Sequence, residues 1–419
     1  MNAAGAAFDR RGPTRVFLKV WRDSLVRIDR AGSMPVSPRT ALLTLYAATN
    51  IAVGIGLALT QPSRAGDLWT IYEWCRAWLL HGQQLYAGPY ATTDYPPNAV
   101  VLFAPLALLP KQWLVPVWAA VTLSITPLLA CVVIRSVRPR IQLADALLPM
   151  LLFFCWGGVR TLLEFSRLCM MLAFLAVFKA DSRPVSSGVS LGLALAKPHI
   201  AGPIMLWALF TRRARVVAVA MAVVAAGFAA YCVRAQVTPT AVMNDYGRIL
   251  LSLYSGADGL IGRTSLRPWW IALAGQESLG DILWGIGAGL LLIVPCGIAM
   301  RGSDVSDVRA AAPALFCLWS LLTIYHIGNN LILMFPAFAF LLLVDDAATL
   351  WWRVSLASAI QLAMMLDVPV HLASSVRDRG PVFLVVRDFD RLVVLVTFIS
   401  VTILWRRLER ARVAPTILA

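Results

Sequence analysis

The sequence predicts an all-helical protein that crosses a membrane many times. Of its 419 residues, 59% are hydrophobic and only 14% are charged, whereas about 25% of the residues in soluble domains are charged. A soluble fold of this length cannot bury so much apolar surface. Apolar stretches of about 17–25 residues recur along the chain and match the length of a helix that spans a bilayer. The alternating pattern of a membrane barrel is not seen, so the fold class is all-α and polytopic.

Positively charged residues cluster at the ends of these apolar stretches. The net charge is +15, which in a soluble protein would suggest a nucleic-acid partner. Here the arginines flank apolar runs, as the positive-inside rule requires, so we expect membrane lipids and no nucleic acid as partners. Residues 1–38 and 406–419 are basic, and we expect both tails in the cytoplasm, with no cleavable signal peptide. Residues 39–405 would form one transmembrane domain.

About ten full spans account for the apolar segments. We place them at residues 41–59, 113–134, 143–158, 162–179, 215–233, 281–300, 311–325, 331–344, 349–366 and 382–404. With both tails inside, residues 60–112 and 234–268 become outer segments. The charge asymmetry therefore predicts a multi-pass protein of the bacterial inner membrane.

The segment 185–211 does not fit a full span. Its two apolar halves have about 11 residues each, or roughly 16 Å as helix, which is half a bilayer. Lys197-Pro198-His199 separates the halves, and arginines flank both ends. Irregular backbone at this depth must be buried in protein or line a wet cavity. We therefore predict a re-entrant or broken hairpin with both ends inside.

The outer loop 60–112 holds polar groups placed for chemistry. An aromatic stretch through Trp74 and Trp78 predicts an amphipathic helix in the membrane interface, where indole rings prefer to sit. The apolar run 98–109 is too short to span and predicts an in-plane or re-entrant helix. Asp67 stands where the first span leaves the membrane. It could act as a general base there, or it could only cap the aromatic helix.

Several motifs follow one another in the order typical of a known family. They are Asp67, Leu85-Tyr86, Asp94-Tyr95-Pro96-Pro97, Pro105 to Pro110, Gly192 to Lys197-Pro198, Ser265-Leu266, and His326 through Asn330 to Pro336. Over residues 40–345 this pattern resembles glycosyltransferase family 87. That family comprises GT-C type transferases that use polyprenyl-phosphate sugars and are best known as mannosyltransferases. The resemblance implies a GT-C-like fold and an essential acid, which is Asp67 in this chain.

The resemblance also implies an activity. The protein would be a polyprenyl-phosphate-sugar-dependent hexosyltransferase, with mannose as the best-known sugar of the family. Its acceptor would be a glycolipid or a polysaccharide, and its active site would face the extracytoplasmic side. The lipid-linked sugar would be a co-substrate, and we expect no separate cofactor and no metal site.

An inverting transfer needs a base for the acceptor hydroxyl and cations for the departing phosphate. Asp67 is the candidate base, with Asp94 and Glu73 as alternatives. Lys197 directly precedes Pro198, and a proline break is costly in a plain helix, so Lys197 is a candidate phosphate contact, although it could instead be ion-paired or reach toward the interface. The candidate substrate-binding residues are Lys197, His199, His326, Asn330, Asp94, Tyr95 and Arg263.

The sequence departs from the family pattern at three places. These departures affect the prediction of the sugar and the acceptor more than the prediction of the fold. Asn330 stands where many members carry Asp, and Arg263-Thr264 stands where Asn-Gln often precedes Ser-Leu. Arg160, Glu164 and Arg167 occupy the region of an expected Gly-Gln signature. In that region we predict an intramembrane ion pair.

Two other functions stay open. A transporter or flippase of lipid-linked saccharide also builds its site from broken helices with charged tips. Against it, the sequence contains no repeated half, and its first outer loop is long and rich in Trp and Pro. The second alternative is a family member that binds glycolipid without turnover, because several family positions are changed.

One further motif is not interpreted as a site. Asp388-Phe389-Asp390 matches the DxD motif of soluble nucleotide-sugar transferases. It lies between two arginines in an apolar run, and the chain has no nucleotide-binding pattern around it.

Overall fold

Helices form all the regular structure in the described part of the chain, which confirms the predicted all-α class. The computed structural model describes residues 66–87, 94–139, 141, 143–154, 156, 165–255, 264–301, 306–324, 328–344, 346–366 and 381–413. All of these residues lie in one compact unit, Thr49–Ala419. The predicted N-terminal tail, 1–38, lies outside the described residues.

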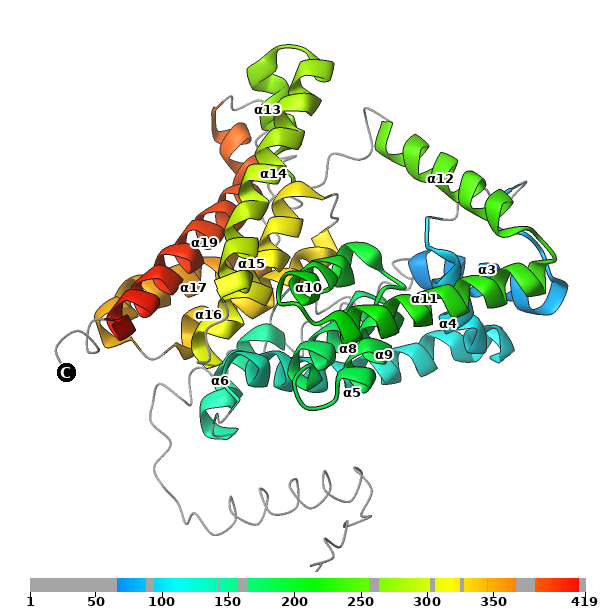
Figure 1. Cartoon of the computed structure of the whole chain (residues 1–419), viewed down its shortest axis with the longest axis horizontal. Coiled ribbons are helices and arrows are strands. Elements are labelled where there is room, and N and C mark those ends of the chain that lie inside the picture. The colour runs from blue at the N-terminus through cyan, green and yellow to red at the C-terminus, as the bar shows by residue number, and fades with distance from the viewer. Residues whose placement is uncertain are drawn as a thin grey trace, which may run out of the picture. The chain divides into compact units, whose positions relative to one another are not determined.

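Figure 1 labels the α-helices of the described residues but not the short 3-10 helices. Those of the first half are α3 (Gly66–His81), α4 (Pro97–Phe103), the 3-10 helix η3 (Ala104–Leu108), α5 (Lys111–Val137), α6 (Leu143–Phe154), α8 (Ser166–Lys179), α9 (Pro184–Ala194), α10 (Pro198–Phe210) and α11 (Ala214–Ala235). Those of the second half are α12 (Pro239–Ser255), α13 (Arg267–Ala274), α14 (Glu277–Arg301), α15 (Ser306–Thr323), η4 (Gly328–Met334), α16 (Phe335–Leu343), η5 (Ala347–Thr349), α17 (Leu350–Leu366) and α19 (Pro381–Val413).

Three helices of the described residues are long and apolar enough to cross a membrane, namely α5, α11 and α14. They coincide with the spans predicted at 113–134, 215–233 and 281–300. Shorter apolar helices cover Ala310–Thr323 and Asn330–Leu343, where two more spans are predicted. The predicted span 41–59 lies outside the described residues, so the full count of about ten spans stays a prediction.

The segment 185–211 is broken where the sequence predicts. Helix α9 ends at Ala194 and α10 begins at Pro198, and each is shorter than the roughly 30 Å of a bilayer core. Pro198 suits the first position of α10 because no N–H donor is needed there, and it also prevents α9 from continuing. The predicted break between two short helices is confirmed, while the hairpin arrangement with both ends on the cytoplasmic side stays a prediction.

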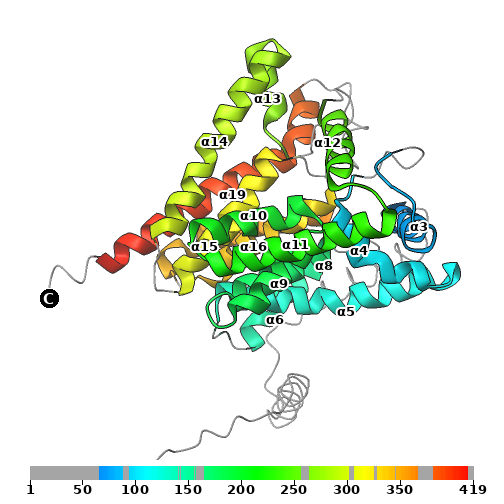
Figure 2. The same cartoon turned by 45° about the vertical axis from the view of Figure 1, so that its right-hand side comes forward.

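Helix α9 packs closely between α8 and α11, and α5 lies against α8 (Figures 1 and 2). Gly188 and Gly192 make the contact of α9 with α11 possible. A Cβ atom at either position would lie only 2.6 Å from the Cβ of Val219 or Val223. Small residues four apart on a helix allow two backbones to approach in this way.

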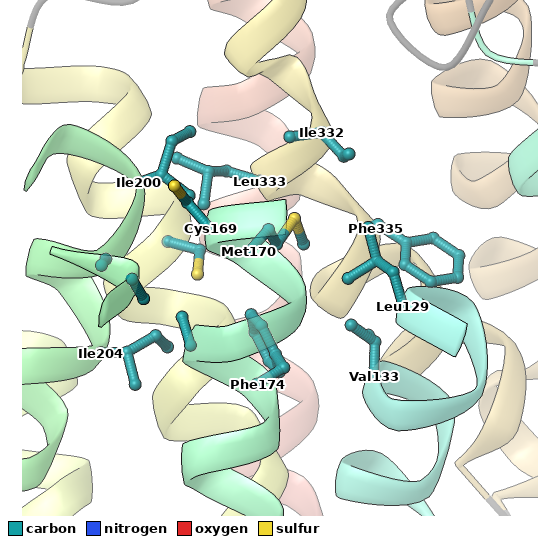
Figure 3. Packing of buried hydrophobic residues seen from close by; sticks show 14 of the residues in the cluster. Leu129, Val133, Cys169, Met170, Phe174, Ile200, Ile204, Ile332, Leu333 and Phe335 are labelled. Atoms are coloured by element: carbon teal, nitrogen blue, oxygen red, sulfur yellow. The ribbon is translucent and has the colours of Figure 1, made fainter. Parts of the chain in front are cut away.

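The hydrophobic core joins α8 and α10 to the segment η4–α16. Figure 3 shows Cys169 and Met170 of α8 between Ile200 of α10 and Phe335 of α16. Leu333, also fully buried, lies next to Ile200 in the same view. This packing fixes the ends of α8, α10 and η4, which carry polar residues of the candidate site.

Candidate functional site

The aromatic stretch of the first outer loop forms α3, with Asp67 exposed in its first turn. Trp74 and Trp78 are buried. The ring centroid of Trp74 lies 6.2 Å from that of Tyr95, and Trp78 stacks on Tyr231 at 5.8 Å. The predicted helix is confirmed, but the prediction that its indoles face the membrane interface is wrong for these two, because aromatic rings from other segments cover them.

The apolar run after Asp94 forms the short helix α4 followed by η3, as predicted. Pro97 occupies the start of α4, where its fixed φ angle suits a helix. Helix α4 packs on α11, and a Cβ atom at Gly227 would lie 2.8 Å from the Cβ of Asn98. This contact holds the Asp94-Tyr95-Pro96-Pro97 motif against the helix bundle.

Three tyrosines fasten the connection between α3 and α4. The Tyr86 hydroxyl donates a hydrogen bond to the carbonyl of Tyr95 at 2.8 Å, and the Tyr246 hydroxyl donates to the carbonyl of Asp94 at 3.3 Å. The ring of Tyr86 lies 5.4 Å from that of Tyr231 and 5.3 Å from that of Tyr246. Tyr231 belongs to α11 and Tyr246 to α12. The position of Asp94 therefore depends on helices far from it in the sequence.

The two segments predicted on the outer side are in contact. Gln84 donates a hydrogen bond from its side-chain amide to Asp245 Oδ2 at 2.8 Å. Gln84 belongs to the segment 60–112 and Asp245 to the segment 234–268. Their contact agrees with the prediction that both segments lie on one side of the membrane.

Lys197 stands at the break between α9 and α10 and is only 4% exposed. Its Nζ donates a hydrogen bond to Ser166 Oγ at 2.9 Å and lies 5.7 Å from the ring centroid of Tyr95. The Ser166 hydroxyl donates in turn to Asn330 Oδ1 at 3.2 Å. The structure thus brings together three residues that the sequence proposes for substrate binding, from three separate segments.

Burial and nearby charges shift the pKa values of Asp94 and Tyr95. Asp94 keeps access to solvent, but burial of its carboxyl raises its pKa above the ordinary value, and the charge of Asp67 raises it further. Its own backbone N–H and the Lys197 ammonium lower this pKa. Burial also raises the pKa of the Tyr95 phenol, which Lys197 opposes and the two carboxylates reinforce. Among these groups, Lys197 is in contact with the ring of Tyr95, which directly follows Asp94.

The other predicted site residues are placed differently. His199 is half-buried in the first turn of α10, and its backbone carbonyl accepts a hydrogen bond from Ser320 Oγ at 3.3 Å. Arg263 and His326 lie outside the described residues. Their predicted contacts with substrate stay predictions.

Glu73 and Arg167, two charged residues considered in the sequence analysis, form other contacts. Glu73 is exposed and forms an ion pair with Lys111 at 3.6 Å, which accounts for this acid without a catalytic role. Arg167 is buried, and its Nη1 lies 3.5 Å from Thr126 Oγ1. Arg160 and Glu164, the other residues of the predicted ion pair, lie outside the described residues.

The Ser265-Leu266 motif is held between α15 and α19. The Thr264 hydroxyl and the Leu266 N–H donate hydrogen bonds to carbonyls of α15 at 2.6 and 2.9 Å. Arg391 Nε donates to the carbonyl of Ser265 at 2.8 Å, and Arg391 also pairs with the buried Asp388. In the described structure the acidic motif of α19 therefore helps to fix this loop.

Sequence reasoning does not find Ser166 and Tyr246. Ser166 is a single hydroxyl near the start of the predicted span 162–179, and Tyr246 is one of two tyrosines in the segment 234–268. The only signal for Ser166 is that a buried lysine needs polar partners. No local pattern says which polar residue supplies them.

A comparison with known protein families shows which site residues lie inside a family match. The model of glycosyltransferase family 87 matches residues 93–325, which is more than half of the chain. Asp94, Tyr95 and Lys197 lie within the match, Asp67 precedes it and Asn330 follows it. Comparisons with curated proteins and with solved structures gave no match. The chain therefore belongs to glycosyltransferase family 87, and it is a membrane glycosyltransferase.

Proposed function

We propose that the protein transfers a hexose from a polyprenyl-phosphate donor to a glycolipid or polysaccharide acceptor. The reaction takes place on the extracytoplasmic side of the bacterial inner membrane. The observation that supports this proposal best is the buried Lys197 ammonium beside the ring of Tyr95, the residue that follows Asp94 in the chain. A transfer of this kind needs one cation for a phosphate and one carboxylate for a hydroxyl proton.

Lys197 is the proposed contact of the donor phosphate. Its ammonium is buried beside the face of Tyr95, and little water is present there to screen its charge. An electrostatic contact is stronger in such surroundings than in bulk water. His199, Arg263 and His326 are proposed as further contacts of donor or acceptor, because they follow the order of the family motifs.

Asp67 is the proposed general base of an inverting transfer. It takes the proton of the acceptor hydroxyl while the hydroxyl oxygen attacks the anomeric carbon of the sugar. The bond between that carbon and the phosphate oxygen breaks, and its electron pair leaves with the polyprenyl phosphate. Lys197 offsets the negative charge that develops on the phosphate. Asp94, with its raised pKa, is the alternative base.

Mannose is the proposed sugar, because it is the best-known substrate of the family that the chain resembles and belongs to. The lipid-linked sugar enters sideways from the membrane, so the protein needs no nucleotide-binding motif. The proposed reaction uses no separate cofactor and no metal ion.

The test compares two acids of the same helix, α3. Purified protein in lipid is given polyprenyl-phosphate mannose and a native membrane extract as acceptor. We expect Asp67→Asn to bind donor but to transfer the sugar about 10²–10⁴-fold more slowly, because it lacks the base. Glu73→Gln, which changes an exposed acid, should keep normal activity.

Two results would contradict the proposal. Normal turnover by Asp67→Asn would place the base elsewhere. If the wild-type protein carried the lipid-linked sugar across sealed vesicles and formed no glycoside, the chain would be a flippase.

A further inference from the structure

A chain of two hydrogen bonds ends on the candidate phosphate contact. Lys197 Nζ donates to Ser166 Oγ at 2.9 Å, and Ser166 Oγ donates to Asn330 Oδ1 at 3.2 Å. We propose that Ser166 and Asn330 are positioning residues, which hold the Lys197 ammonium in the geometry that meets the donor phosphate. This inference rests on the proposed function, because it takes Lys197 as the phosphate contact.

The direction of these hydrogen bonds follows from the groups involved. An ammonium can only donate, so the Ser166 oxygen must accept from Lys197. A hydroxyl has one hydrogen, and in this arrangement that hydrogen points to the Asn330 carbonyl oxygen. Lys197, Ser166 and Asn330 are 4%, 2% and 2% exposed. Water therefore competes little with these bonds, and they can hold one geometry.

The three residues are anchored in separate and rigid elements. Ser166 is the first residue of α8, Lys197 directly precedes α10, and Asn330 lies in η4. The same elements pack on one another through Cys169, Ile200 and Leu333, as Figure 3 shows. A lysine side chain is flexible by itself, so fixed polar partners decide where its charge lies.

The uncharged side chain at position 330 has an electrostatic consequence. An aspartate there would place a carboxylate one hydroxyl group away from Lys197, in a buried region where charges interact strongly. That carboxylate would compete with a phosphate for the ammonium. The amide oxygen of Asn330 orients Ser166 without adding negative charge. Asn at position 330 is therefore better suited than Asp to an anionic ligand at Lys197.

The first experiment measures the dissociation constant of a polyprenyl phosphate that carries no sugar, with the full-length protein in lipid nanodiscs. Ser166→Ala should weaken binding roughly tenfold or more, because a hydrogen bond to a charged group is lost. Ser187→Ala is the matched control. Ser187 of α9 is also fully buried and donates a hydrogen bond to the α8 carbonyl of Ala176 at 2.8 Å. This control should bind as tightly as the wild type.

A double substitution separates positioning from a general loss of structure. If Ser166 acts through Lys197, adding Ser166→Ala to Lys197→Ala should cause no further loss of affinity. Ser166→Thr keeps a hydroxyl and should restore binding. Additive losses, or no rescue by threonine in a protein that stays folded by thermal unfolding, would overturn the inference.

Substitutions at position 330 test the role of its neutral charge. Asn330→Leu removes the acceptor and Asn330→Asp adds a carboxylate, and both should weaken polyprenyl phosphate binding. Wild-type affinity in Asn330→Asp would overturn the electrostatic part. If Lys197→Ala loses binding while Ser166→Ala does not, the positioning role fails but the proposed function stands. If the wild-type protein does not bind polyprenyl phosphate, both fail.

Discussion

Lys197 Nζ lies 5.7 Å from the ring centroid of Tyr95, although the two residues come from different motifs of the chain. Tyr95 belongs to the segment 60–112, and Lys197 stands at the break between α9 and α10. The contact brings a buried cation next to the segment that carries Asp94. Because both motifs lie within the part of the chain that matches glycosyltransferase family 87, this contact defines the center of the candidate active site.

Replacement of Lys197 tests its role as a phosphate contact. Lys197→Ala should raise the KM for the donor roughly 10–100-fold, because a charged hydrogen bond to phosphate is lost. Lys197→Arg should retain part of the affinity, since a cation remains although its shape differs. Lys111→Ala, which removes an exposed cation of the outer loop, serves as the control and should leave KM unchanged. Steady-state kinetics that show a normal KM for Lys197→Ala would make Lys197 structural.

The pKa of Asp94 should respond to its two charged neighbours in opposite directions. Asp67→Asn removes a negative charge, so the pKa should fall, whereas Lys197→Met removes a positive charge, so it should rise. Carbodiimides modify protonated carboxyl groups. The midpoint pH of Asp94 labelling, followed by peptide mass spectrometry, should therefore decrease in the first variant and increase in the second. A shift in the same direction in both variants would contradict the arrangement of charges.

Tyr246 connects α12 to the candidate site through the carbonyl of Asp94. Tyr246→Phe keeps the ring that packs on Tyr86 but removes this hydrogen bond. We expect kcat/KM to fall roughly 3–10-fold, as for the loss of one uncharged hydrogen bond. Ser252→Ala, on the same helix, removes a hydrogen bond to the carbonyl of Ile249 and should have no effect on kcat/KM. Equal effects of the two variants would show that α12 acts only through its general stability.

Close packing of α9 on α11 can be tested at Gly192. Gly192→Ala would place a Cβ atom 2.6 Å from Val223 Cβ and 2.8 Å from the carbonyl oxygen of Ala220. The resulting overpacking should destabilise the protein by about 1–3 kcal/mol and lower its Tm. Gly202→Ala, on α10, has open space around the new Cβ, so its Tm should stay the same or rise slightly. An unchanged Tm for Gly192→Ala would contradict this packing.

The sequence predicts the features of this protein that depend on local composition. The all-α class follows from recurring apolar segments, and the broken hairpin follows from Lys197-Pro198 between two halves that are each too short to span. The short helix after Pro97 is predicted because the apolar run 98–109 is likewise too short to span. These features need no knowledge of which segments meet in space.

Features that depend on contacts between distant segments are not predicted. Trp78 is an interfacial residue by its type, yet Tyr231 of α11 covers it. Ser166 is an ordinary hydroxyl until Lys197 and Asn330 lie beside it. The order of the family motifs along the sequence identifies most residues of the candidate site. The hydrogen bonds that position Lys197 are seen only in the folded structure.

The product of the reaction tests the central claim most directly. Wild-type protein in lipid is incubated with polyprenyl-phosphate mannose of known anomeric configuration and the membrane extract as acceptor, and the new glycoside is analysed by NMR. Because the acceptor oxygen attacks opposite the departing phosphate, we predict one new glycosidic bond of inverted configuration. A product of retained configuration, or no new glycoside from a folded protein that binds the donor, would contradict it.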